Sequence, residues 1–148
     1  MIKLREMSED ELKALGAMDT DADTHAHITV YSLDEHRREF ARDDIVYLSI
    51  LDDGALAGYF ILRLEDDGDS IEFRRIVVAR KGRGTGQAAI AAMEAYCAET
   101  LRRGRIWLDV FESNARGHHV YTKLGYHHFD TGELRGRKLL FMDKRVST

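Results

Sequence analysis

Proline is absent from this 148-residue sequence, where average usage would give about seven residues. The absence excludes cis-proline turns and proline-kinked helices. A single cysteine, Cys97, excludes an intrachain disulfide and a zinc site built from several cysteines. No apolar run approaches the roughly 18 residues of a membrane helix, and the N-terminal segment MIKLREMSEDE has no apolar signal core. We therefore expect a cytoplasmic protein with no membrane partner.

An excess of positive charge is also missing, because 22 Lys and Arg residues face 26 Asp and Glu residues, for a net charge of −4. This balance predicts no bulk electrostatic binding of nucleic acid. Hydrophobic residues make up 44% of the chain and charged residues 32%, which is typical of a globular domain. Since the chain has no repeat or linker, we expect one domain over residues 1–148.

Local patterns alternate between strand and helix along the chain. Ser8 with Glu11, and Ser32 with Glu35, have the spacing of a helix capping box. We expect strands at about residues 2–6, 45–51, 55–64, 70–79, 106–111, 126–131 and 138–143, and helices at about residues 9–18, 33–42, 87–102 and 115–124. This order predicts a mixed sheet with helices packed against it, in the α/β or α+β class.

The strand expected at residues 70–79 contains several charged residues. Strict alternation would place Glu72, Arg74, Ile76 and Val78 on one face. Arg74 and Arg75 would then point to opposite faces of the sheet, and we assign neither a role.

This strand is followed by KGRGTG at residues 81–86, directly before an amphipathic helix. The three glycines allow a tight turn in which backbone N–H groups converge. The start of the helix adds unpaired N–H donors and the positive end of its dipole. The segment therefore predicts an anion site, most plausibly for a phosphate or pyrophosphate, or else a tight turn without a ligand. The Walker and dinucleotide-binding motifs do not fit its spacing.

This junction resembles the coenzyme A loop, Gln/Arg-x-x-Gly-x-Gly/Ala, of the GCN5-related N-acetyltransferase (GNAT) family. Residues 121–126, YTKLGY, resemble the family's Tyr-x-Lys-Leu-Gly-Phe segment, and Asn114 lies seven residues before Tyr121, as the family has it. The order of elements fits along nearly the whole chain. Two departures are Lys81 in place of Gln or Arg, and Gly117 where the family's helix usually has alanine.

The resemblance implies a single domain with a mixed, mostly antiparallel sheet of about six or seven strands and helices on both faces. It implies acetyl-CoA as co-substrate, no metal, and a small-molecule or peptide amine as acceptor. Many relatives dimerise, so a homodimer is open. Two central parallel strands would splay near Val78 and residues 109–111, leaving backbone groups free for the pantetheine arm.

The resemblance also implies the residues that bind coenzyme A. They are the backbone of Ile76, Val77 and Val78 at the pantetheine and thioester, the N–H groups of Arg83, Gly84, Thr85, Gly86 and Gln87 at the pyrophosphate, and the side chains of Asn114 and Tyr121. Tyr121 would be the general acid that protonates the departing thiolate; the alternative is a tyrosine that only packs on the sheet. Asn114 would contact the cofactor or serve as a plain helix cap.

Glu72 is the candidate general base toward the incoming amine, which would attack the thioester directly in a ternary complex. Its alternative is an ion pair with Arg74 on the same strand. Asp109 on the neighbouring strand is the rival base, and a chain of water molecules could also carry the proton. The acidic turns, such as Asp66–Asp67, either attract a cationic acceptor or are solvated loops.

Seven histidines raise the question of a metal. The adjacent pairs at 118–119 and 127–128 diverge along a helix or strand, and no cysteine cluster accompanies them, so we expect no metal site. Two other function classes stay open: a CoA-binding sensor without turnover, and a phosphate-binding interaction domain. Transfer of a longer acyl group, or transfer to a hydroxyl group, is a third alternative.

Overall fold

The computed structural model describes residues 1–20, 30–79 and 84–147 of the chain. Its strands are β1 (Ile2–Glu6), β2 (Ile45–Asp52), β3 (Ala55–Leu64), β4 (Ser70–Val78), β5 (Arg105–Phe111), β6 (His127–Leu134) and β7 (Arg137–Arg145). Its helices are the 3-10 helix η1 (Glu9–Ala14) and the α-helices α1 (Leu15–Asp19), α3 (Leu33–Phe40), α4 (Thr85–Glu99) and α5 (Ala115–Lys123). In these three ranges no helix is long and apolar enough to cross a membrane.

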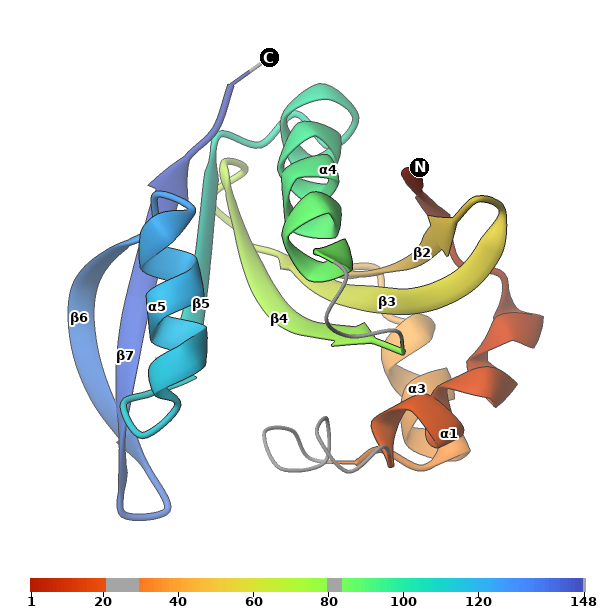
Figure 1. Ribbon diagram of the computed structural model, residues 1–148, viewed down its shortest axis with the longest axis horizontal. Coiled ribbons are helices and arrows are strands. Elements are labelled where there is room, and N and C mark those ends of the chain that lie inside the picture. The colour runs from red at the N-terminus through yellow and green to blue at the C-terminus, as the bar shows by residue number, and fades with distance from the viewer. Residues whose placement is uncertain (21–29, 80–83, 148) are drawn as a thin grey trace.

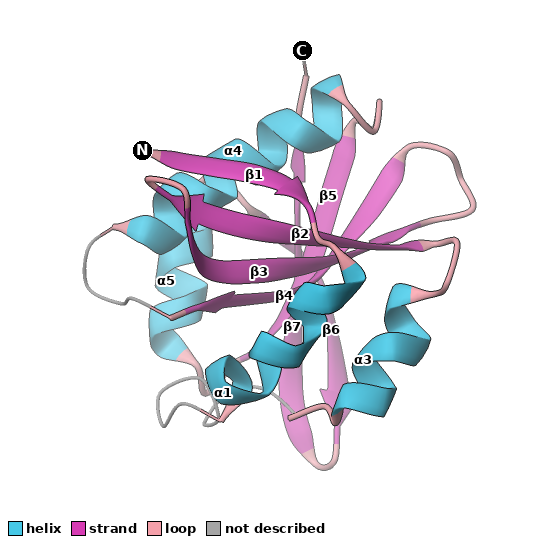
Figure 2. Ribbon diagram, turned by 90° about the vertical axis from the view of Figure 1, so that its right-hand side faces the viewer, coloured by secondary structure: helices cyan, strands magenta, loops and turns pink. Residues whose placement is uncertain are grey.

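All seven strands form one sheet in the order β1-β2-β3-β4-β5-β7-β6. Every neighbouring pair is antiparallel except β4 and β5, which run parallel. The helix α4 connects these two strands, as a parallel pair requires a crossover. Helices α4 and α5 lie on one face, and η1, α1 and α3 lie on the other (Figures 1 and 2). The expected mixed, mostly antiparallel sheet with helices on both faces is confirmed.

Short-range signals set most element ends. The backbone N–H of Ser8 binds the Glu11 carboxylate at 3.0 Å, and that of Ser32 binds Glu35 at 2.9 Å, so both capping boxes form. The first box begins a 3-10 helix that continues as α1, where the sequence predicts one α-helix. Asp53 and Gly54 both have positive φ, 50° and 87°, which suits a two-residue hairpin turn between β2 and β3.

Two apolar cores lie on opposite faces of the sheet. The larger one lies under α4 and α5 and includes Phe60, Leu62 and Phe73 together with Met93 and Cys97 of α4. The smaller one lies under η1, α1 and α3 and includes Leu12, Leu15, Tyr47 and Tyr59. Strands β2 and β3 are therefore buried on both faces, which explains their nearly continuous apolar sequences.

The expected faces of β4 are wrong, because this strand contains a β-bulge. Phe73 pairs with Leu62 and Arg75 with Ile61, so Arg74 has no partner in β3. The extra residue reverses the alternation, and Ile76 and Val78 lie on the α4 side, whereas Glu72 lies on the opposite face.

The two arginines at the bulge also differ from the expectation. Arg74 lies 3.5 Å from Glu39 of α3, and Arg75 lies 3.7 Å from Asp19 of α1. Both side chains therefore point to the face that η1, α1 and α3 cover, instead of to opposite faces. A bulge redirects side chains in this way, and a pattern of period two in the sequence does not reveal it.

Candidate active site

The central feature of the sheet is an opening between β4 and β5. The two strands pair only at Ser70–Arg105, Ile71–Ile106 and Glu72–Trp107, and beyond this point they diverge (Figure 1). Because β5 continues to pair with β7 as far as Phe111, the edge of β5 that faces β4 is open over residues 108–111. Backbone groups along this opening can pair with an extended, amide-rich ligand. The strands thus separate as the family resemblance implies.

The start of α4 lies after the end of β4 at this opening. Gly84 is its N-cap with φ 71°, and none of the described side chains caps the helix there. The first backbone bond of the helix runs from Ala88 N–H to the Gly84 carbonyl at 3.1 Å. The N–H groups of Thr85, Gly86 and Gln87 are therefore not used within the helix and carry the positive end of its dipole.

The two glycines at this helix start differ in what they require. At Gly84 any side chain would be strained by the positive φ. At Gly86 an added Cβ would meet, among the described residues, only the Val78 side chain at 4.0 Å, so these residues leave that space open. This space is what the close approach of a pyrophosphate to the backbone needs. Arg83, the remaining residue predicted for the pyrophosphate, lies outside the described residues.

Asn114 caps α5, because its Oδ1 accepts a hydrogen bond from the Gly117 N–H at 3.0 Å. Gly117 makes this contact close, since an added Cβ would lie 2.7 Å from Asn114 Nδ2. The side-chain oxygen of Asn114 therefore serves as the helix cap, which is one of the two roles that the sequence left open. The amide nitrogen of Asn114 remains a hydrogen-bond donor for a ligand.

Tyr121 projects from α5 into the larger core beside β4. Its ring makes edge contacts with Phe73 of β4 at 5.9 Å and with Tyr126 at 6.0 Å between ring centroids. Burial raises the pKa of the Tyr121 phenol to about 12, and the charge of Asp109 adds to the effect. Tyr121 therefore keeps its proton throughout the neutral pH range.

Asp109 and Glu72 lie on the two strands that border the opening, and their surroundings differ. Partial desolvation raises the pKa of Asp109, and repulsion from Glu72 raises it further, while Arg74 lowers it. Glu72 is held by Arg63 at 2.8 Å and lies 3.7 Å from Arg74. The ion pair with Arg74 that the sequence left open is thus present, and a second arginine joins it.

A buried polar network under α1 and α3 was not predicted. His36 of α3 lies 2.9 Å from the Asp19 carboxylate and 2.8 Å from the Tyr47 hydroxyl. The Tyr59 hydroxyl donates to Asp19 at 2.5 Å. Asp19, which lies just beyond the helix expected at residues 9–18, is fully buried. The four residues come from four separate elements, α1, α3, β2 and β3, so no local pattern could have shown this network.

The described residues also bear on the question of a metal. Within residues 1–20, 30–79 and 84–147, no group of three or more His, Cys, Asp or Glu side chains is arranged to hold a metal ion. Cys97 is buried in the larger core, with its Sγ 3.6 Å from Met93 Sδ. Its thiol is a packing group there.

Comparisons with known proteins place this geometry in a family. A model of the acetyltransferase (GNAT) family matches residues 6–126, and the chain belongs to this family. With that membership it belongs to the acetyl-CoA-dependent N-acetyltransferases, with acetyl-CoA as co-substrate. A comparison with curated protein sequences found no match.

Solved structures share the fold across the full chain. A spermidine N-acetyltransferase from Vibrio cholerae, in complex with CoA and spermine, matches with a TM-score of 0.83 and 18% identity, over 98% of this chain and 95% of that one. The aminoglycoside acetyltransferase AAC(6')-Ib, in complex with coenzyme A, matches with a TM-score of 0.83 and 17% identity, over 98% and 95%. At these identities the likeness extends to the fold alone.

Proposed function

We propose that this protein moves an acetyl group from acetyl-CoA to a primary amine, which attacks the thioester directly while both reactants are bound. The observation that carries the proposal is the opening between β4 and β5, with unused helix N–H groups at its α4 end and the Tyr121 phenol beside it. The two solved relatives have names that specify small polycationic amines, spermidine and aminoglycosides, which supports a small-molecule amine as acceptor.

In this proposal coenzyme A supplies an activated acetyl group, and the backbone holds it. The N–H groups of Thr85, Gly86 and Gln87 bind the pyrophosphate. The free edge of β4 at residues 76–78 pairs with the pantetheine arm, and one N–H there polarises the thioester carbonyl. Positioning the amine and the thioester side by side supplies much of the rate.

The proton balance requires two groups beside the opening. The amine loses a proton as the C–N bond forms, and the thiolate needs one when the C–S bond breaks. The Tyr121 phenol, protonated at neutral pH, donates to the departing sulfur. Of the two carboxylates predicted as bases, Asp109 is the better acceptor for the amine proton, because Glu72 is engaged by Arg63 and Arg74.

A thiol-release assay with acetyl-CoA tests this function against a panel of small amines and peptide N-termini. An enzyme releases CoA only when an acceptor is present, and the product carries one acetyl group on nitrogen. A non-catalytic sensor of the same fold would bind CoA, seen as a thermal shift, without release for any acceptor. A phosphate-binding interaction domain would show no thermal shift with CoA.

A further inference from the structure

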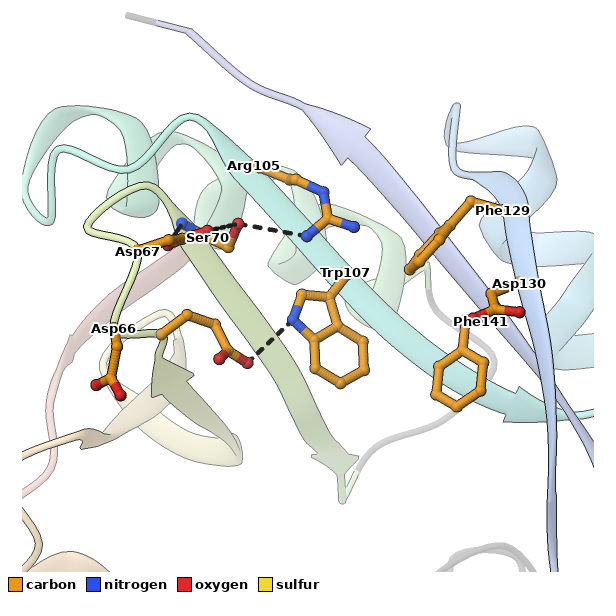
Figure 3. Close-up of a pocket in the computed structure, with 9 residues that line it drawn as sticks. Asp66, Asp67, Ser70, Arg105, Trp107, Phe129, Asp130 and Phe141 are labelled. Carbon is orange, nitrogen blue, oxygen red and sulfur yellow. Dashed lines mark hydrogen bonds between the residues drawn. The ribbon is translucent and has the colours of Figure 1, made fainter.

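A cavity of about 400 Å³ lies on the sheet face opposite α5, where β5, β7 and β6 are not covered by a helix of the described chain. It is bordered on one side by the β3–β4 turn at residues 65–67 and on the other by the strand β6 (Figure 3). A cavity of this volume suits a small molecule.

Three aromatic rings form the inner surface of this cavity. Trp107 of β5 and Phe141 of β7 lie 6.0 Å apart between ring centroids, and Phe129 of β6 lies 6.3 Å from Phe141. The Trp107 indole N–H is fixed by Glu65 at 3.2 Å. Gly132 of β6 leaves room for the Phe141 ring, because an added Cβ at this position would lie 2.7 Å from that ring.

A second β-bulge provides the outer wall. His128 pairs with Met142 and Asp130 with Phe141, so Phe129 is an extra residue in β6. Phe129 and its neighbour Asp130 consequently both line the cavity, which strict alternation would forbid. Figure 3 shows both side chains on the β6 side of the cavity.

The charge of this cavity is negative. It is lined by four carboxylates, Glu65, Asp66, Asp67 and Asp130, and one guanidinium, Arg105. Arg105 is neutralised by Asp143 at 2.9 Å. Among the described residues, Asp66 and Asp130 are in no ion pair, so their charges are available to a cation. Aromatic faces and carboxylates together favour a positively charged organic group.

The cavity ends where the opening between β4 and β5 begins. Trp107 belongs to the last pair that joins these strands, and Asp109 lies two residues further along β5 on the same face. The strand rise puts Asp109 about 7 Å beyond Trp107. An elongated molecule in the cavity could therefore extend its far end to the proposed base.

We infer that the acceptor is an amine with a second positive charge separated from the reacting nitrogen by an apolar spacer, and that this cavity holds the non-reacting end. The spacer lies along Trp107 and Phe141, and the two unpaired carboxylates on opposite sides of the cavity, Asp66 and Asp130, attract the remote cation. This inference rests on the proposed acetyl transfer and specifies its acceptor.

Paired acceptors test the inference on the full-length protein with acetyl-CoA: 1,6-diaminohexane against hexylamine, which share a six-carbon chain. We expect kcat/KM for the diamine to exceed that of the monoamine by about tenfold, well above the twofold factor from its two equivalent amino groups. The ratio should fall as salt is added, because the attraction is partly screened.

Variants of the unpaired carboxylates localise the effect. Asp130→Asn and Asp66→Asn should each lower the diamine-to-monoamine ratio several-fold, and the double variant should bring it close to two, with hexylamine turnover and CoA affinity retained. Glu133→Gln is the matched control, since Glu133 is an exposed carboxylate on the same strand whose pairing with Lys138 places it on the other face. It should leave the ratio unchanged.

Calorimetric titration of 1,6-diaminohexane into the CoA-loaded protein separates this inference from the proposed function. Equal kcat/KM for both amines, or a ratio that Asp66→Asn and Asp130→Asn leave intact, overturns the inference while acetyl transfer stands. Diamine binding that depends on Asp66 and Asp130, without acetylation of any amine, overturns the proposed function instead.

Discussion

The two halves of the sheet, on either side of the β4–β5 opening, are built differently. In the first half, strands β2, β3 and β4 are covered on both faces, by α4 on one side and by η1, α1 and α3 on the other (Figure 1). Strands β5, β7 and β6 are covered by α5 on one face, no helix of the described ranges covers their other face, and β6 is exposed along most of its length. The difference suggests that the first half provides rigidity and that the second half provides a surface for recognition.

Stability measurements give the largest expected contrast between the halves. Phe60→Ala removes a fully buried ring from β3 and should lower the free energy of unfolding by about 3–5 kcal/mol. Phe129→Ala on β6, whose ring is 48% exposed, should cost less than about 1 kcal/mol. Urea unfolding of both variants measures the contrast. Similar losses in the free energy of unfolding would contradict the contrast, because they would mean that Phe129 is packed as tightly as Phe60.

Catalysis should depend on Tyr121, which projects from α5 in the second half toward β4 in the first half. Tyr121→Phe keeps the ring against Phe73 but removes the hydroxyl, and kcat should fall by about 100-fold while the Kd for CoA stays the same. Tyr96→Phe is the control, because Tyr96 of α4 is another partly buried phenol packed on the same core. Loss of kcat in both variants would indicate a packing effect and not acid catalysis.

The base should belong to β5 and not to β4. Asp109→Asn should lower kcat/KM by up to about 100-fold, and Glu72→Gln should lower it less. Because the pKa of Asp109 is raised, wild-type kcat/KM should decline with falling pH at a higher pH than for an ordinary aspartate, and the decline should disappear in Asp109→Asn.

Stability supplies a second measurement for Asp109. A raised carboxyl pKa means that the ionised form costs stability above that pKa. At neutral pH the Asn variant should therefore melt at an equal or higher temperature than the wild type, and the gap should close as the pH falls. A variant that loses both activity and Tm at pH 7 would contradict this assignment.

The smallest expected effect is on CoA binding at the start of α4, the helix that covers one face of the first half. Gly86→Val should weaken CoA binding by about tenfold, or 1.4 kcal/mol, because its side chain would fill the space beside the helix N–H groups. The fold should tolerate the change, since Val78 is the one described residue near the added side chain. Gly16→Val in α1, where an added Cβ also meets open space, is the control. An unchanged affinity for CoA in Gly86→Val would mean that the pyrophosphate does not bind at the start of α4.

Local signals in the sequence were sufficient for the ends of most elements. The capping boxes at Ser8 and Ser32, the Asp53–Gly54 turn, and Gly125 with φ 98° after α5 all act within a few residues of chain. The glycines near the start of α4 and the spacing from Asn114 to Tyr121 indicated the family for the same reason. Tyr121 as the general acid, Glu72 or its rival Asp109 as the base, and the homodimer stay predictions.

What the sequence did not reveal depends on contacts between distant segments or on one extra residue. The bulge at Arg74 reversed the faces of β4, and no residue type marks it. The burial of Asp19 could not be predicted, because its partner His36 lies 17 residues away in the sequence. The cavity at Trp107 and Phe141 forms only when β5 and β7 become neighbours. A search for paired acidic and aromatic residues on one strand face could have indicated Trp107 and Asp109.

The extra residue in β6 has an evolutionary consequence. Loss of the single codon for Phe129 would leave His128 paired with Met142 and Asp130 paired with Phe141 in regular alternation, and it would remove one aromatic ring from the cavity while leaving β4, α4 and Tyr121 untouched. Acceptor choice could therefore change in one genetic step while the acetyl donor is held as before. A lineage with this architecture can diversify its substrates without rebuilding its chemistry.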